Sequence, residues 1–269
     1  EFMEMNKNLK DYGSISFIIT SDEEGKAING TKKVVEWLIN KSEKISGCIV
    51  GEPTNVNQMG DTIKIGRRGS FTGYLTVKGI QGHVGYPDLA ENPINSLLKM
   101  LEPFAKIYLD KGTNEFQPSS VMITTIDVNN DASNVIPGEV KAKFNIRFNT
   151  LHSVASLKSM LKNQFDAITK NYEFDYFCNA EPFLTSDEEL KSTLQNAITK
   201  VVNVNPEKST TGGTSDARFI TKLCPVIEFG LVGKTMHKID ENVEVDDIMK
   251  LTSIYNKFLQ NYFRVEKND

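Results

Sequence analysis

The stretch Ile15-Ser16-Phe17-Ile18-Ile19-Thr20-Ser21-Asp22-Glu23-Glu24-Gly25 decides the fold class. An apolar run is followed at once by acids and a glycine, which predicts a buried strand that ends at the rim of a sheet. In open α/β sheets, ligands bind beyond the carboxyl ends of the strands. We therefore expect Glu23 and Glu24 at a functional site, where one carboxylate can hold a metal ion and the other can move a proton. The alternative is a solvated acidic turn.

The same arrangement recurs further along the chain. The apolar run Cys48-Ile49-Val50 is followed by Gly51-Glu52-Pro53, and His237 lies in a loop after another predicted strand. Carboxylate and imidazole groups bind Zn²⁺ at about 2.0–2.2 Å. The pattern therefore indicates a candidate metal site formed by Glu24, Glu52 and His237, although a lone loop histidine is more often a surface residue.

The middle of the chain follows a different pattern. Residues from about 70 to 180 predict the order strand, helix, strand, strand, helix, strand, which is that of a ferredoxin-like βαββαβ module. The predicted strands are 71–77, 121–128, 140–148 and 174–177, and the helices are 93–109 and 153–170. In the third strand Val140, Ala142, Phe144, Ile146 and Phe148 alternate onto one face.

The flanks predict one α/β domain that this module interrupts. Helices are expected at 31–40, 187–202 and 245–262, strands at 48–50, 61–65 and 224–229, and a helical tail at 2–9 before a turn at 11–13. The expected domains are 1–68 and 182–269 for the two segments of the α/β domain and 69–181 for the inserted module.

Composition excludes several classes of function. The chain has 269 residues, 39% apolar and 25% charged, which are ordinary values for a globular protein. A net charge of -4 and the lack of a basic stripe argue against nucleic acid or membrane partners. No segment is long and apolar enough to span a bilayer. Cys48, Cys178 and Cys224 are widely spaced, which favours a reducing, cytoplasmic location.

Several other residues are candidates for ligand binding or catalysis. The loop Gly212-Gly213-Thr214-Ser215-Asp216 can turn backbone N–H groups toward an anion, but no Gly-Lys-Ser/Thr follows as in a phosphate-binding P-loop. Arg67, Arg68 and Arg147 are candidate carboxylate clamps because of their planar forks of donors. Each of these features is also common in ordinary turns and surfaces.

Of two further histidines one is a candidate, whereas serine and cysteine nucleophiles are disfavoured. His83 lies between glycines in a shaped loop, whereas His152 begins a helix and is expected at the surface. A serine hydrolase is disfavoured because no Gly-x-Ser-x-Gly turn occurs. A cysteine nucleophile is disfavoured because Cys48 and Cys224 fall in apolar strands, where thiols are usually inert.

Seven ordered motifs together resemble one family, the co-catalytic zinc peptidases and deacylases that include succinyl-diaminopimelate desuccinylase, acetylornithine deacetylase and carboxypeptidase G. The motifs are Ile19-Thr20-Ser21-Asp22-Glu23-Glu24, Val50-Gly51-Glu52-Pro53, Gly66-Arg67-Arg68-Gly69, Gln81-Gly82-His83-Val84, Ser133-Asn134-Val135-Ile136-Pro137-Gly138, Thr211-Gly212-Gly213-Thr214-Ser215-Asp216 and His237-Lys238-Ile239. The resemblance covers nearly the whole chain. The Arg-Arg-Gly turn and the Thr-Gly-Gly-Thr-Ser-Asp loop favour the desuccinylase branch.

The resemblance implies a role for each candidate at the metal site. Glu23 matches the general base that activates water, Glu24 and His237 match ligands of one zinc ion, and Glu52 matches a ligand of a second. The family uses two Zn²⁺ ions, with Co²⁺ as a possible replacement. His83 matches a histidine that reaches the partner subunit's active site and stabilises the oxyanion.

The resemblance also implies a substrate and an assembly. The residues that match groups binding substrate carboxylates are Arg67, Arg68, Asn134, Arg147, Gly213 and Thr214. The implied reaction is hydrolysis of N-succinyl-LL-2,6-diaminopimelate to succinate and LL-2,6-diaminopimelate, in lysine and diaminopimelate biosynthesis. The inserted module matches the lid and dimerisation domain, so a homodimer is expected.

One departure from the family limits these expectations. The family has an upstream His-x-Asp motif and an aspartate that bridges the two metals, whereas only 22 residues precede Glu23. We therefore expect an incomplete metal site and no activity from this chain alone. Two alternatives stay open: an N-acyl amino acid deacylase or dipeptidase of the same family, and a non-catalytic dimerising or binding protein.

Overall fold

The computed structural model describes residues 13–25 and 27–264. The helical tail predicted at 2–9 and most of the turn predicted at 11–13 lie outside the described residues. The chain divides into two compact units, which we call unit 1 (Glu1–Arg67 with Leu184–Asp269) and unit 2 (Arg68–Phe183). The short strands β3 (Gly66–Arg67) and β10 (Phe183–Leu184) lie at the boundaries between them.

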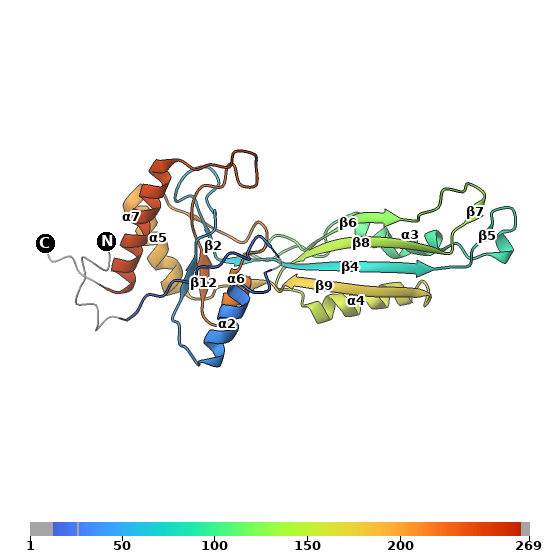
Figure 1. Cartoon of the computed structure of the whole chain (residues 1–269), viewed down its shortest axis with the longest axis horizontal. Helices are drawn as coiled ribbons and strands as arrows, with labels where there is room; N and C mark the ends of the chain where they lie inside the picture. Colours follow the sequence, from blue (N-terminus) through green and yellow to red (C-terminus); the bar gives the residue numbers. More distant parts are fainter. Residues whose placement is uncertain (1–12, 26, 265–269) are drawn as a thin grey trace. The chain divides into compact units, whose positions relative to one another are not determined.

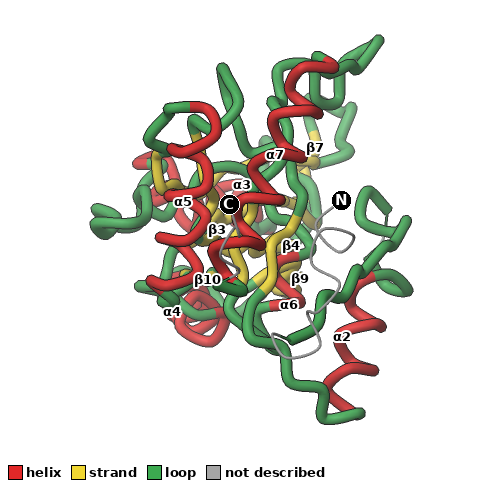
Figure 2. The backbone as a smooth tube through the Cα atoms, turned by 90° about the vertical axis from the view of Figure 1, so that its left-hand side faces the viewer, coloured by secondary structure: helices red, strands yellow, loops and turns green. Residues whose placement is uncertain are grey.

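Unit 1 is a mixed four-stranded sheet with helices on both sides. The strands lie in the order β1 (Cys48–Val50), β12 (Val226–Glu228), β2 (Thr62–Lys64) and β11 (Glu207–Ser209). β1 and β12 are parallel, as are β2 and β11, whereas β12 and β2 are antiparallel. In Figure 1 the sheet separates the helix pair α5 (Glu188–Val202) and α7 (Val245–Tyr262) from α2 (Thr31–Asn40) and the short α6 (Ala217–Ile220). Figure 2 shows α2 well apart from α5 and α7.

The core of unit 1 lies between the sheet and the helix pair. Helix α5 begins where the Asp187 side chain accepts a hydrogen bond from the backbone N–H of Leu190 at 2.8 Å, an ordinary N-cap. Its apolar face, including Leu194 and Ile198, is fully buried together with Ile254 of α7. The helices predicted at 31–40, 187–202 and 245–262 and the strands at 48–50, 61–65 and 224–229 are thus confirmed, with ends that shift by one or two residues.

The strand predicted at 15–20 is wrong. Residues 13–20 have no regular secondary structure, and the side chains of Phe17 and Ile19 are 84% and 90% exposed. A strand exists only if its backbone N–H and C=O groups find a partner strand. Within the described part of the chain β1 is at the edge of the sheet, and no strand pairs with its outer side. The apolar pattern of residues 15–20 therefore does not suffice to predict a strand, because it does not show whether a partner strand is present.

A well-defined turn follows this segment. The Asp22 carbonyl accepts hydrogen bonds from the N–H groups of Gly25 and Ala27, and its carboxylate accepts from those of Ile28 at 2.6 Å and Asn29 at 2.8 Å. These bonds lower the pKa of Asp22, with Asn29 the largest contributor. Asp22 is therefore the residue that shapes the acidic turn carrying Glu23 and Glu24.

Unit 2 is an antiparallel four-stranded sheet in the order β6-β8-β4-β9. Helices α3 and α4 contribute their apolar faces to its core. Its elements are β4 (Gly69–Lys78), β5 (Gly82–His83), the 3-10 helix η2 (Pro87–Leu89), α3 (Pro93–Leu101), the 3-10 helix η3 (Glu102–Lys106), β6 (Ser120–Asp127), β7 (Val135–Ile136), β8 (Glu139–Phe148), α4 (Val154–Asp166) and β9 (Tyr172–Ala180). Strands β5 and β7 form a separate antiparallel pair.

Both predicted helices of unit 2 are shorter than expected. Helix α3 ends at Leu101 and continues only as the 3-10 helix η3, because Pro103 has no N–H to extend the α-helical hydrogen bonds. Helix α4 ends at Asp166 rather than at 170. The alternation predicted in the third strand is confirmed, since the side chains of Val140, Ala142, Phe144, Ile146 and Phe148 are all buried on one face of β8.

Glycine at position 73 is required by its cross-strand neighbour. Gly73 of β4 pairs with Phe144 of β8, and a Cβ atom at position 73 would lie 2.3 Å from the Phe144 ring, which is itself fully buried. We expect Gly73→Ala to destabilise the protein by about 1–3 kcal/mol, the usual cost of overpacking a core. Chemical denaturation measures this. Gly213→Ala is the control, because nothing lies within 4 Å of a Cβ there; equal losses in both variants would contradict the packing argument.

Candidate active site

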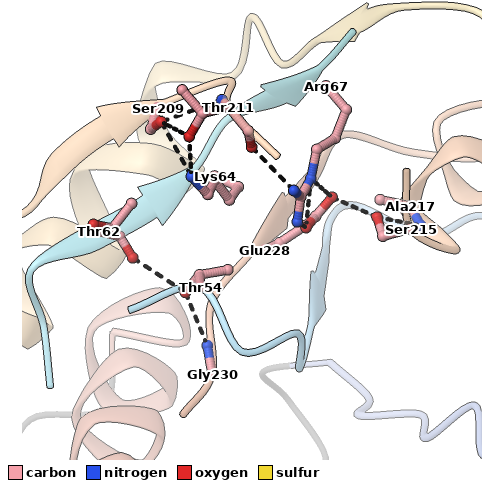
Figure 3. Close-up of polar contacts among 10 residues, drawn as sticks. All are labelled: Thr54, Thr62, Lys64, Arg67, Ser209, Thr211, Ser215, Ala217, Glu228 and Gly230. Carbon is pink, nitrogen blue, oxygen red and sulfur yellow. Dashed lines mark hydrogen bonds and ion pairs between the residues drawn. The ribbon is translucent and has the colours of Figure 1, made fainter. Parts of the chain in front are cut away.

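Charged residues meet at the strand ends of the unit 1 sheet (Figure 3). Glu228, the last residue of β12, is fully buried and pairs in register with Lys64, the last residue of β2. Arg67 follows β2 by a few residues, and Thr211 and Ser215 lie in the loop after β11. The sheet therefore places a buried carboxylate beside two cations and a polar loop.

Arg67 and Glu228 form a buried ion pair. The Nε of Arg67 donates to both carboxylate oxygens of Glu228, at 3.1 and 3.0 Å, and Nη2 also pairs with that carboxylate. Nη1 donates to the carbonyl of Thr211 at 3.0 Å, and the hydroxyl of Ser215 donates to Glu228 at 2.6 Å. Charge-assisted bonds of this kind are stronger than neutral ones, so they connect the ends of β2 and β12 to the loop at 210–216.

Lys64 is also hydrogen-bonded to the start of the loop at 210–216. Its Nζ donates to the hydroxyl of Ser209 at 3.1 Å and to that of Thr211 at 2.6 Å. Burial lowers the pKa of Lys64, and the nearby charge of Arg67 lowers it further, while Glu228 opposes the shift.

Gly212 allows this loop to approach Arg67. Its φ of +103° lies in the region that side chains avoid, and a Cβ there would lie 2.4 Å from Nη1 of Arg67. No other residue would fit both the backbone conformation and the space, so the glycine is explained by the position of the guanidinium.

The turn after β1 is fixed next to this network. The hydroxyl of Thr54 donates to the Thr62 carbonyl at 3.1 Å and accepts from the N–H of Gly230 at 3.3 Å (Figure 3). Both bonds are buried, so the turn that carries Glu52 is held between β2 and the segment after β12.

Glu23 and Glu52 lie in a group of mutually repelling carboxylates. Burial raises the pKa of Glu52 to about 7, with further upward shifts from Glu228 and Glu23. Burial also raises the pKa of Glu23, followed by the charges of Glu24 and Asp216. Glu23 therefore lies within electrostatic range of Glu52, while the roles predicted for both residues stay predictions.

Sequence reasoning named Asp216 only as part of a motif. Its side chain is 6% exposed, and among the described residues its Oδ1 has no hydrogen-bond partner. Its charge acts on both Glu23 and Glu52. The signal that could have found it is the acid placed directly before a helix, at the end of the glycine-rich loop.

The raised pKa of Glu52 predicts a pH-dependent stability in metal-free protein. Below about pH 4.5 Glu52 is protonated in both states, and between there and about pH 7 only the folded state keeps the proton. The contribution of Glu52 to the stability of the folded state is therefore lost as the pH rises through 7. In EDTA, we expect the melting temperature of Glu52→Gln relative to the wild type to rise between pH 4.5 and pH 8.

A second glutamate provides the control of opposite sign. The hydrogen bond from Lys33 lowers the pKa of Glu36, so Glu36→Gln should lower the melting temperature slightly at pH 8. Thermal melts across this pH range check both variants. If the melting-temperature difference between Glu52→Gln and the wild type does not change with pH, the environment of Glu52 does not disfavour its charged form.

The remaining predicted zinc ligands are more exposed. His237 and Glu24 are both exposed, and His237 has a positive φ of 59°, with its N–H donating to the Glu241 carboxylate at 3.2 Å. Carboxylates and an imidazole are suitable zinc donors. Nevertheless, the described residues contain no group of three or more His, Cys, Asp or Glu side chains that could hold a metal ion. The ligand roles of Glu24, Glu52 and His237 stay predictions, and we assign no reaction step to a metal.

His83 and Asn134 lie close together in unit 2. His83 pairs with Val135 in the β5–β7 ladder, and the carbonyl of Asn134 accepts a hydrogen bond from the N–H of Val84 at 3.1 Å. The Nδ1 of His83 accepts from the N–H of Gly85 at 3.0 Å. A neutral ring with an accepting Nδ1 carries its proton on Nε2, so the exposed ring is prepared to donate a hydrogen bond.

Arg68 and Arg147 are two cations of unit 2 that form no ion pair among the residues described. Arg68 donates through Nη1 to the Pro118 carbonyl at 3.0 Å, and its buried Nε has no hydrogen-bond partner there. Burial lowers the pKa of both guanidinium groups, and that of Arg147 is lowered further by the charge of Arg68. An added anion would relieve this repulsion.

The other sequence expectations concern His152, the cysteines and the membrane. His152 is less exposed than expected, because its Nε2 lies 3.2 Å from the Asp110 carboxylate and its side chain is 19% exposed. Burial raises the pKa of Cys48 to about 11 and that of Cys224 to about 12, so neither is a ready thiolate nucleophile. Of the helices described, none has the length and apolar character needed to cross a membrane.

The sequence model of peptidase family M20/M25/M40 matches residues 2–261. This chain belongs to that family. M20 enzymes are metal-dependent hydrolases, and the α/β fold with mixed sheets described above is the fold of this group.

Among the M20 proteins, several desuccinylases are similar in sequence. Succinyl-diaminopimelate desuccinylase of Pelagibacter ubique (strain HTCC1062) is 54% identical over 260 residues, which cover 95% of this chain and 68% of that protein. The desuccinylase of Parvibaculum lavamentivorans (strain DS-1) is 50% identical and is aligned over 93% of this chain and 65% of its own length. The chain thus spans about two thirds of the length of these curated relatives.

Solved structures of two peptidases share the fold at much lower sequence identity. Aminopeptidase PepT from Bacillus cereus ATCC 10987 aligns with a TM-score of 0.74 at 17% identity, covering 97% of this chain and 68% of its own. A tripeptidase from Staphylococcus aureus subsp. aureus Mu50 aligns with a TM-score of 0.72 at 17% identity, covering 98% and 68%. These likenesses concern the fold alone.

Proposed function

We propose that this chain belongs to a desuccinylase that hydrolyses N-succinyl-LL-2,6-diaminopimelate to succinate and LL-2,6-diaminopimelate, in lysine and diaminopimelate biosynthesis. The observation that carries the proposal is 54% and 50% identity to two proteins described as succinyl-diaminopimelate desuccinylases. The peptidases of similar fold are only 17% identical.

The proposed substrate suits the charges of the candidate site. It carries several carboxylates, and planar guanidinium groups bind carboxylates with two parallel hydrogen bonds. Arg68 and Arg147 form no ion pair among the described residues, so a carboxylate would compensate two repelling cations. Asn134, Gly213 and Thr214 complete the proposed carboxylate-binding set.

Glu23 is the proposed proton carrier of the reaction. Its raised pKa brings it nearer to neutrality, where a carboxylate can accept a proton from the attacking water and return it to the leaving amine. The donor Nε2 of His83 is proposed to stabilise the oxyanion. Glu24, Glu52 and His237 are proposed as part of the ligand set for two Zn²⁺ ions, which Co²⁺ can replace.

A homodimer through unit 2 is also proposed. Strand β6 is an edge of the unit 2 sheet, and its Met122 and Ile126 side chains are 55% and 50% exposed. Exposed apolar edge strands are templates for pairing with another chain. Light scattering of Ile126→Lys, which should be monomeric, tests this. A cytoplasmic location is proposed from the three free cysteines.

The decisive experiment is an assay of two proteins with added Zn²⁺. One is this chain alone, and the other is a chimera in which the upstream segment of the Pelagibacter ubique desuccinylase precedes it. We expect no turnover from the chain alone. We expect the chimera to prefer N-succinyl-LL-2,6-diaminopimelate over N-acetylornithine and dipeptides by at least about 10²-fold in kcat/KM.

Each result separates the candidate functions. A chimera that prefers N-acetylornithine or a dipeptide would make the protein a different M20 deacylase or peptidase. A chimera that is folded but inactive on all three would favour the non-catalytic binding protein. Turnover by the chain alone at the rate of the chimera would contradict the incomplete metal site.

A further inference from the structure

We propose that Glu228 is a positioning residue for carboxylate recognition. It orients the guanidinium of Arg67 and, through Arg67 and Ser215, holds the loop at 211–215 in the form that receives a substrate carboxylate. The inference rests on the proposed function, since that substrate supplies the carboxylate. Glu228 has no part in the family motifs that the sequence presents.

Glu228 is a buried acceptor that two donors share. Its side chain is fully buried at the end of β12, where an unpaired carboxylate would be costly. Arg67 and Ser215 both donate to it, from β3 and from the loop before α6 (Figure 3). Glu228 is therefore the common acceptor that joins two segments, and its removal would free both.

Arg67 keeps N–H donors that its bonds to Glu228 and Thr211 do not use. Nε and Nη2 bond to Glu228 and Nη1 bonds to the Thr211 carbonyl. A guanidinium carries more N–H groups than these bonds use, so Nη1 and Nη2 each keep one N–H for a further acceptor. Because the Glu228 carboxylate occupies one edge of the planar group, the direction of the remaining N–H groups is fixed.

Charges of both signs surround the Arg67 guanidinium. Arg67 is paired with the buried carboxylate of Glu228, whereas Lys64 donates to the hydroxyls of Ser209 and Thr211. The carboxylates of Glu52, Glu23 and Asp216 lie within electrostatic range of the same site, so an arriving carboxylate needs directed donors rather than a general positive field. A Cβ at Gly213 would meet nothing within 4 Å, so the loop borders open space. A ligand carboxylate can approach the loop there.

The sign of one measurement distinguishes positioning from simple electrostatics. Removing the negative charge of Glu228 makes the site more positive, which by charge alone strengthens anion binding. Loss of positioning acts in the opposite direction, because Arg67 and the loop must then be ordered by the ligand itself. A purely structural role changes stability but not the affinity of the folded protein.

The experiment measures succinate binding to the whole chain by calorimetry at pH 7. We expect Glu228→Gln, which keeps the shape of the side chain, to raise the Kd for succinate about tenfold. In an Arg67→Lys background, which retains a cation opposite Glu228, the same change should alter the Kd less than about twofold. Tighter binding by Glu228→Gln, or an equal loss in both backgrounds, would overturn the proposal.

A second readout needs no ligand. The ¹⁵N signal of Arg67 Nε, assigned with Arg67→Lys, reports its hydrogen bond to Glu228. We expect its N–H exchange with solvent to accelerate at least about tenfold in Glu228→Gln. An unchanged rate would show that Glu228 does not hold Arg67. If the wild type shows this protection but does not bind succinate, the result contradicts the proposed dicarboxylate substrate. The proposed orientation of Arg67 by Glu228 would still hold.

Thr185→Val is the matched control. The buried hydroxyl of Thr185 donates to the Val226 carbonyl at the start of β12 and not to Arg67, Glu228 or the loop at 211–215. This variant loses a buried hydrogen bond in the same sheet but should leave both the succinate Kd and the Arg67 signal unchanged. A similar loss of succinate affinity in Thr185→Val would assign the effect of Glu228 to general destabilisation.

Discussion

Arg67→Met is expected to lower the free energy of unfolding by about 3–5 kcal/mol, because it leaves the Glu228 carboxylate buried without the cation that is hydrogen-bonded to it. The Arg67 side chain is 10% exposed and that of Glu228 is fully buried, so water cannot replace the lost partner. Urea unfolding at pH 7 measures the loss.

Two further variants show whether the loss comes from the stranded charge. Replacing both residues, as Arg67→Met with Glu228→Met, should recover most of the stability, since a buried ion pair and an apolar pair are often nearly equivalent. Lys78→Met breaks an ion pair with Glu173 that is more than half exposed on both sides, and should cost less than about 1 kcal/mol. Equal losses for Arg67→Met and Lys78→Met would contradict the importance of burial.

The largest expected effect on catalysis is that of Glu23. In the chimera, Glu23→Gln should lower kcat on N-succinyl-LL-2,6-diaminopimelate by about 10²–10⁴-fold, with a much smaller change in KM. The amide keeps the size of the side chain but cannot carry a proton. Steady-state kinetics with saturating Zn²⁺ provide the measurement.

The control for Glu23 is another glutamate of the same unit. Glu36 is on the exposed side of α2, where its carboxylate accepts a hydrogen bond from Lys33 at 2.8 Å. Glu36→Gln should leave kcat unchanged. A Glu23→Gln variant that retains more than about a tenth of the activity would exclude Glu23 as the base.

Local pattern was sufficient where one face of an element is buried. The alternation from Val140 to Phe148 predicted β8 because those side chains fill the core of unit 2. It was insufficient where the partner strand decides the structure. The apolar residues Phe17 and Ile19 form no strand, whereas the polar run Glu207–Ser209 does, because it pairs with β2.

The candidate site was predictable where acids follow strands and not where contacts are distant in sequence. Glu23 and Glu52 were found because each follows an apolar run and precedes a turn. Glu228 ends an apolar strand in the same way, but its partner Arg67 is 161 positions away. A buried acid at a strand end requires a cation, which is the signal that could have led to the pair. Nothing in the sequence specifies which arginine supplies it.

The pairing of Ser70 with Ala180 in unit 2 has a consequence for the order of folding. The unit 1 sheet joins Thr62 to Glu207 across the whole of unit 2. Closing a flexible loop of roughly 145 residues, the separation of Thr62 and Glu207, costs about 4 kcal/mol of chain entropy. Once β4 and β9 have paired, the entry and exit of unit 2 are neighbours, and most of that cost has already been met. Unit 2 should therefore fold before the unit 1 sheet can close.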